Sequence, residues 1–387
     1  MGTEISAALA NAAKKVAPGG VTKDELKGLR TVALGDETID HEERGFLAGL
    51  LDGANASKVA GGGTSFVFTK ASIDAHLTEV ADLNRPEVDD AVVTAFKEKW
   101  KAVAAGEPDE AAKHVREEED ASLAQMKRLV GTSREPRLRS VVDWAAAQGV
   151  RTPQLLTVMI MGASDSTAGD MLLAATVYAV AAAVKHPLQF DLLGGKIKVD
   201  QVPKAQLGIA DASYSAEGMG KDKGDTIYVP ESLSIDNAAH RSQIIHELQH
   251  AVQDRGATTG LIRVEAELDG YRAQARYLLD QIAPLQASAR DAAVKQTAKI
   301  TNAILIRALI LESRRNSRVF EMVIVDINSE VPANVRLSTG DLAAFIATGD
   351  AVLISDAKAA IRSVYGIGPY DVGPGAGFKG EHDTGRM

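Results

Sequence analysis

The chain has 387 residues, enough for two or three domains with buried cores. Hydrophobic residues make up 45% of it and charged residues 25%, a balance typical of an ordinary soluble protein rather than a disordered polypeptide or a multi-span membrane protein. The formal charge of -9 argues against nucleic acid as a general partner. The sequence has no cysteine, so disulfides, thiolate metal sites and cysteine nucleophiles are excluded, and a metal would be held by His, Asp or Glu.

The N-terminus carries no export signal, because an Ala-rich stretch comes before Lys14 and Lys15, the reverse of the order in a secretory peptide. The most apolar run covers residues 171–184. It is too short to cross a bilayer and predicts a buried helix that ends near Pro187. We therefore expect a cytoplasmic protein without a membrane span, with unconventional export left open.

Residues 1–60 contain two segments, opened by Val21 and Ile39, that each begin a helical pattern. They weakly resemble a pair of EF-hands, but neither loop has a full set of calcium ligands. In the second loop Glu37 replaces the glycine that the sharp turn requires. We expect a small helical module, degenerate and EF-hand-like, without a normal calcium site.

The rest of the sequence divides by composition. A glycine run at 61–63 opens a helical, charged region that extends to residue 150, and a third region follows over 151–365. In the third region the patterns predict a helix over 168–184, strands at 196–199, 212–215 and 226–229, and helices over 236–255, 261–283, 287–325 and from Ser338 or Thr339. Residues 366–387 are Gly-rich and are expected to form a flexible tail. The expected fold class is α+β, mainly helical, with a small sheet.

The strongest chemical signal is His246-Glu247-Leu248-Gln249-His250. On a helix, His246 and His250 project one turn apart from the same stripe, from which two imidazoles can bind one Zn²⁺. Glu247 leaves the helix at another angle, as a general base acting on metal-bound water must. The apolar residues of this helix fall on the opposite face, so the His stripe is not core filler.

A catalytic zinc site needs a third protein ligand. The next acidic cluster contains Glu265, Glu267 and Asp269, on a helix that follows a turn at 256–260. In an antiparallel helix pair, His250 and Glu265 lie at similar distances from this turn, so we expect Glu265 to be the ligand, with Glu267 as the alternative. Asp269, four residues after Glu265, is expected to accept a hydrogen bond from a ligating imidazole.

These motifs resemble the gluzincin family of zinc metallopeptidases, in which an HExxH helix is followed by a helix that carries a ligating Glu and, four residues later, an Asp. The resemblance covers roughly residues 195–285 and implies a zincin-like metallopeptidase domain within 151–365. It implies His246, His250 and Glu265 as ligands and Glu247 as the catalytic base. It also implies an edge strand, from segments 211–215 and 225–229, that pairs with the backbone of a substrate.

The sequence therefore predicts a zinc-dependent endopeptidase that acts on a protein or peptide. Two alternatives stay open: a catalytically inactive binding module with the same fold, and a zinc hydrolase of a non-peptide bond. Residues 1–150 are expected to dock a partner or regulate the enzyme without supplying a catalytic group. The sequence does not choose the donor that would stabilise the oxyanion, for which the candidates are Tyr271, Tyr277, His240, Tyr365 and Tyr370.

Overall fold

The structure is a computed structural model that describes Val32 and residues 108–207, 212–216, 224–256, 262–314 and 317–368. The expectations for the EF-hand-like module, for the glycine joint and for nearly all of the tail lie outside the described residues. The protein divides between Gln201 and Val202 into two compact units. The boundary predicted at residue 150 therefore falls inside the first unit.

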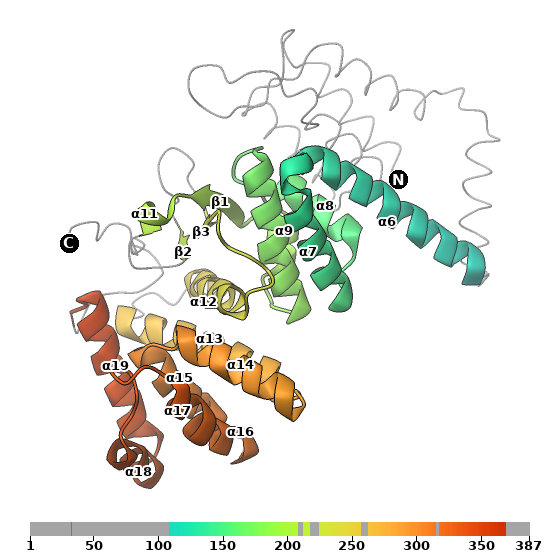
Figure 1. Cartoon of the computed structure of the whole chain (residues 1–387). Helices are drawn as coiled ribbons and strands as arrows, with labels where there is room; N and C mark the ends of the chain where they lie inside the picture. Colours follow the sequence, from blue (N-terminus) through green and yellow to red (C-terminus); the bar gives the residue numbers. More distant parts are fainter. Residues whose placement is uncertain are drawn as a thin grey trace, which may run out of the picture. The chain divides into compact units, whose positions relative to one another are not determined.

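The first unit is helical. Its helix α9 lies among α6, α7 and α8 (Figure 1) and also contacts α10. Helix α9 is buried along most of its length, which agrees with the buried helix that the sequence predicts. Thr167 caps α9, because its side chain accepts a hydrogen bond from the backbone N–H of Asp170. From residue 108 on, the α-helices described in this unit are α6 (Pro108–Val130), α7 (Glu135–Ala147), α8 (Thr152–Met161), α9 (Ala168–Ala183) and α10 (Gln189–Leu193).

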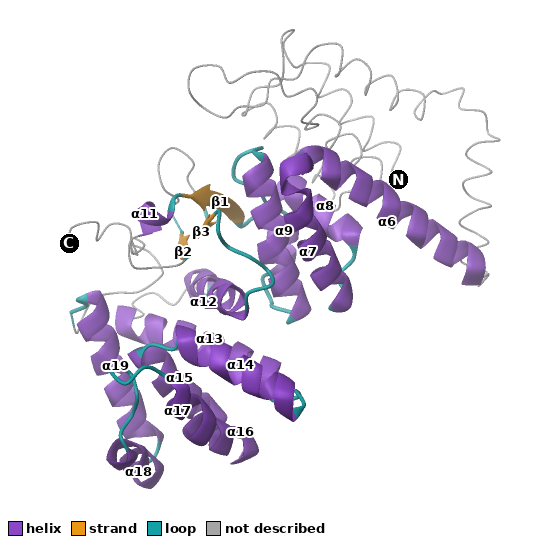
Figure 2. Cartoon of the chain, in the orientation of Figure 1, coloured by secondary structure: helices purple, strands orange, loops and turns teal. Residues whose placement is uncertain are grey.

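Three short strands form one sheet in the order β1-β3-β2 (Figure 2). The strands are β1 (Lys198–Val202), β2 (Ser213–Ser215) and β3 (Thr226–Pro230). Strands β2 and β3 are antiparallel, with Tyr214 opposite Ile227. All three predicted strands are present, the first of them shifted toward its C-terminal end. The mainly helical α+β class with a small sheet is thus confirmed.

The second unit is built around helix α13, which packs against α12, α14, α15 and α19. The short helix α11 lies on β3, where Leu207 packs with Val202 and Tyr228. Among its described residues, the α-helices are α11 (Lys204–Leu207), α12 (Ala238–Arg255), α13 (Arg263–Ile282), α14 (Ala287–Ile300), α15 (Ala303–Ser313), α16 (Ser317–Met322), α17 (Asn328–Glu330), α18 (Thr339–Thr348) and α19 (Asp350–Tyr365).

The single helix predicted over 287–325 is wrong. It is divided into α14, α15, α16 and the start of a π-helical segment at Val323–Ile327. The first break is at Asn302, whose side chain accepts hydrogen bonds from the backbone N–H groups of Ile304 and Leu305 and so begins α15 as a new helix. By contrast, α18 starts as predicted, after a capping box formed by Ser338 and Asp341.

Two helices position the candidate site. Asn237 caps the N-terminus of α12. On one face of this helix, the side chains of Ile244, Leu248 and Ala251 are completely buried. The opposite side, with its two histidines, is also buried, because α13 packs beside α12. Within the described residues, no helix is long and apolar enough to cross a membrane.

Candidate metal centre

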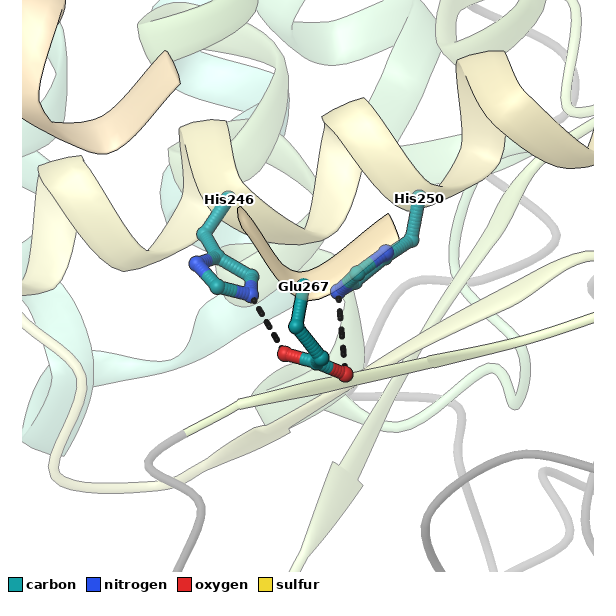
Figure 3. Close-up of side chains that lie close together, drawn as sticks. All are labelled: His246, His250 and Glu267. Atoms are coloured by element: carbon teal, nitrogen blue, oxygen red, sulfur yellow. Dashed lines mark ion pairs between the residues drawn. The ribbon is translucent and has the colours of Figure 1, made fainter. Parts of the chain in front are cut away.

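Three side chains from α12 and α13 converge to form a buried group (Figure 3). The Nε2 atom of His246 lies 3.5 Å from Oε2 of Glu267, and Nε2 of His250 lies 3.8 Å from Oε1 of the same carboxylate. The Glu267 side chain is 1% exposed. One ligand atom from each of the three residues lies within 4.8 Å of the other two. A buried carboxylate thus faces two imidazole nitrogens.

These distances suit a metal ion better than they suit direct hydrogen bonds. Zn²⁺ held tetrahedrally at about 2.1 Å from its ligands keeps the ligand atoms roughly 3.4 Å apart. The Oε2 atom of Glu267 is buried and has no hydrogen-bond partner within the part of the protein that the structure describes. Such an atom is costly unless a ligand binds it. His246, His250 and Glu267 could therefore hold a metal ion through three protein ligands.

The orientation of His250 is set by Gln253, one turn further along α12. Gln253 donates through Nε2 to the carbonyl oxygen of Ala266 at 3.2 Å, so its Oε1 is the atom that faces Nδ1 of His250, at 3.0 Å. An amide oxygen only accepts, so Nδ1 of His250 carries the proton. In the neutral imidazole the lone pair is then on Nε2, the atom that faces Glu267.

A second glutamine has the same relation to His246. Gln274 on α13 donates through Nε2 to Oγ of Ser242 at 3.1 Å, and it forms a side-chain hydrogen bond with His246. The imidazole of His246 also lies edge-on to the ring of Tyr271, with the ring centres 4.8 Å apart. Both imidazoles are thus oriented by neutral amides.

Burial and charge oppose each other in this group. Burial would lower the pKa of His246, but the Glu267 carboxylate beside it and the charge of Glu247 raise that pKa. Burial would raise the pKa of Glu267, but the positive charges of His250 and His246, with a contribution from Arg263, lower it. A metal that binds here must therefore compete with a proton for the imidazole of His246, so its binding should weaken as the pH falls.

Glu247 is separate from the three converging side chains and is held by the sheet. Its Oε2 accepts a hydrogen bond of 2.8 Å from the backbone N–H of Tyr214 on β2. Strand β2 is at the edge of the three-stranded sheet, and α12 packs against it. The residue predicted to be the base thus has a fixed orientation beside His246 and is not one of the convergent ligand atoms.

The structure does not bring Glu265, the ligand preferred from the sequence, together with the imidazoles. Its carboxylate is 39% exposed and pairs with Lys358 on α19. The reason is helix rotation: Glu265 lies on a half-exposed stripe of α13, whereas Glu267 lies on the stripe that faces α12. Glu267, the predicted alternative, is the acidic residue that converges with the two imidazoles.

Asp269 is not in the place predicted for it either. Its side chain is 46% exposed and lies 4.0 Å from Arg272, and it reaches the group through a hydrogen bond with Gln253. Burial raises the pKa of the Asp269 carboxyl. The direct partner of His250 is therefore the glutamine and not the aspartate.

The five residues considered as possible oxyanion donors differ in where the structure places them. Tyr271 contacts His246 and its hydroxyl lies 2.7 Å from that of Tyr365, so these two candidates are together beside the site. The hydroxyl of Tyr277 accepts from Nε of Arg241, and Nδ1 of His240 accepts from the N–H of Ser234. Tyr370 lies outside the described residues.

Three residues of the site were not predicted from the sequence: Gln253, Gln274 and Gly270. A methyl group at position 270 would come within 2.7 Å of Nε2 of His246, so α13 approaches the imidazole with no side chain between them. The available signal was their spacing, since Gln253 lies three residues after His250, and Gly270 and Gln274 lie three and seven residues after Glu267.

Comparisons with models of protein families, with curated proteins and with solved structures found no match to this protein. Its function is therefore inferred from the geometry of the site.

Proposed function

We propose that this protein is a zinc-dependent metallopeptidase in which His246, His250 and Glu267 hold the metal and Glu247 is the general base. The observation that carries the proposal is that α12 presents two possible metal ligands and, separately from them, one carboxylate that is free to act as a base. The two imidazoles converge on Glu267, while Glu247, next to His246 in the sequence, is held apart by Tyr214. A purely structural metal site has no need of a fixed carboxylate in that position.

Bound zinc would supply a Lewis acid and a water molecule of lowered pKa. The protein's own residues supply the rest. Gln253 and Gln274 hold the imidazoles in the orientation that presents nitrogen to the metal, and Glu267 adds a negative charge. Glu247 accepts the proton of the attacking water and returns it to the leaving amine. The backbone N–H of Tyr214 keeps that carboxylate in one orientation.

A peptide substrate is favoured over other hydrolysable substrates by strand β2. The N–H of Tyr214 points to Glu247 and so away from β3, and in an antiparallel strand the carbonyl of the same residue points to the same side. The outer edge of β2 is therefore next to the base. An extended peptide that pairs with this edge would bring its carbonyl groups to Glu247. In the hydrogen-bonded pair Tyr271 and Tyr365, one hydroxyl donates to the other, and the hydroxyl that accepts is the donor proposed to stabilise the developing oxyanion.

Glu247→Gln tests this proposal. The amide keeps the shape of the side chain but is unable to accept the proton, so the variant should keep zinc and lose hydrolysis by at least about a hundredfold. Zinc content and cleavage of casein would be measured on the parent and the variant. Equal cleavage by both proteins would refute the role of Glu247, and a zinc-loaded parent that cleaves no protein or peptide would refute the peptidase.

A further inference from the structure

A buried cation, Arg263, lies close to the metal group. Arg263 is the first residue of α13, one helical turn before Glu267 and on the same face of the helix. The residue is 9% exposed, and its Nε atom is buried without a hydrogen-bond partner among the residues that the structure describes. Its charge is near enough to contribute to lowering the pKa of Glu267, after the larger effects of burial, which raises it, and of the two histidines.

The second unit contains a matched counterexample. Arg241 on α12 is also 9% exposed, but its Nε donates to the hydroxyl of Tyr277 at 2.7 Å and its Nη1 to the carbonyl oxygen of Ile235 at 2.5 Å. Arg241 therefore joins α12 to α13 and to the segment before α12. Arg263, equally buried, forms no such connection through Nε.

A buried guanidinium donor without a partner is unfavourable, because arginine does not lose its proton and the donor gives up its hydration without gaining a hydrogen bond. Replacing a poorly compensated buried charge with an apolar side chain of similar volume is often neutral or stabilising. Arg263 is nevertheless a buried cation, and it lies one helical turn from Glu267. A charged side chain in such a place is a candidate for binding the substrate.

We propose that Arg263 forms a carboxylate-binding subsite of the peptidase, beside the metal ligands. The inference rests on the proposed function, because peptides always carry this anion at their C-terminus and often on side chains. The planar guanidinium binds a carboxylate through two parallel hydrogen bonds, one of which would use the Nε donor that has no partner among the described residues. The enzyme would thus select substrates with a carboxylate near the cleaved bond.

The test uses the full-length, metal-free protein and three small probes, whose binding is followed by NMR. N-acetylalanine represents the C-terminus of a peptide, N-acetylaspartic acid α-amide represents an acidic side chain, and N-acetylalanine amide is the neutral control. At least one carboxylate probe should bind the parent about tenfold more tightly than the neutral amide, and the stronger of the two identifies the source of the carboxylate. Arg263→Met should remove this preference, and Arg263→Lys should weaken it, because lysine lacks the planar fork.

Thermal unfolding provides the second readout. Arg263→Met should be at least as stable as the parent, whereas Arg241→Met should be clearly less stable, because it leaves the groups that Arg241 joins without their donor. Equal binding of all three probes by the parent, an unchanged preference in Arg263→Met, or a loss of stability in Arg263→Met like that in Arg241→Met would each overturn the proposal. Neither probe binding nor thermal unfolding measures zinc uptake or hydrolysis. A failure of the Arg263 proposal can therefore be distinguished from a failure of the peptidase proposal.

Discussion

Gly270 on α13 lies directly against the imidazole of His246 on α12. A Cβ atom at position 270 would be 2.7 Å from Nε2, 2.8 Å from Cε1 and 3.0 Å from Cδ2 of that ring. Separations this short are not tolerated between such atoms, and the ring is the end of a side chain, so the ring must move. The ring nitrogen that would move is the one that faces Glu267.

We expect Gly270→Ala to weaken zinc binding by about tenfold or more while the protein stays folded, because it displaces a ligand without removing one. Chelator competition would measure the affinity, and the visible spectrum of the cobalt-substituted protein would report the changed ligand geometry. The matched control is Gly340→Ala in α18, where the nearest atom to the new methyl group is Ser338 Oγ at 3.7 Å. Equal zinc affinity in both variants would contradict the close approach at Gly270.

The neutral partner of His250 gives a second prediction. Gln253→Leu removes the hydrogen bond to Nδ1 and should lower zinc affinity by roughly 10–100-fold, the usual effect of losing a group that orients a ligating histidine. Asp269→Asn should cause a smaller loss, because Asp269 acts only through Gln253. The two affinities would be ranked by competition with a chelator. The opposite order would make Asp269 the residue that orients the imidazole.

The first unit offers a prediction about pH. His186 follows α9, and its Nδ1 accepts from the N–H of Leu188 at 3.3 Å; burial lowers its pKa to about 4. The folded state therefore disfavours the protonated form. The contribution of neutral His186 to the free energy of unfolding is fully present above the unfolded pKa of about 6.5. It is lost as the pH falls from there toward 4, by an amount of order 1–2 kcal/mol.

Urea unfolding at pH 7.5 and at pH 5 would measure this loss. In His186→Asn, which keeps an acceptor but does not titrate, the difference in unfolding free energy between the two pH values should be smaller than in the parent. A variant with the same pH dependence as the parent would show that His186 does not contribute.

Much of the site could be predicted from the sequence because it depends on helical spacing. The two histidines four residues apart and the buried helix at 168–184 both follow from local pattern. The sequence favoured Glu265 because distance along the helix does not report rotation around it, and it is Glu267 that the structure brings to the imidazoles. Rotation separates two stripes of α13: Glu267, Gly270, Tyr271 and Gln274, all buried, and Glu265, Asp269, Arg272 and Arg276, all at least partly exposed.

Other features could not be predicted from one sequence, because they depend on contacts between elements. The hydrogen bond from Tyr214 to Glu247 joins residues 33 positions apart and requires β2 to lie along α12. That the Nε atom of Arg263 lacks a partner, whereas the Nε atom of Arg241 has one, is apparent only in the folded structure. The breaks within 287–325 were missed because the apolar pattern continues through Asn302, and the cap there determines where the helix restarts.

The central claim is that His246, His250 and Glu267 hold one metal ion, and zinc titration of the metal-free protein at neutral pH tests it most directly. The parent should bind about one zinc per molecule. Glu267→Ala should lose most of that affinity, and Glu265→Ala should keep it, because the ion pair of Glu265 with Lys358 is a partly exposed contact between α13 and α19. A parent that binds no zinc, or a site lost in Glu265→Ala and kept in Glu267→Ala, would contradict the account.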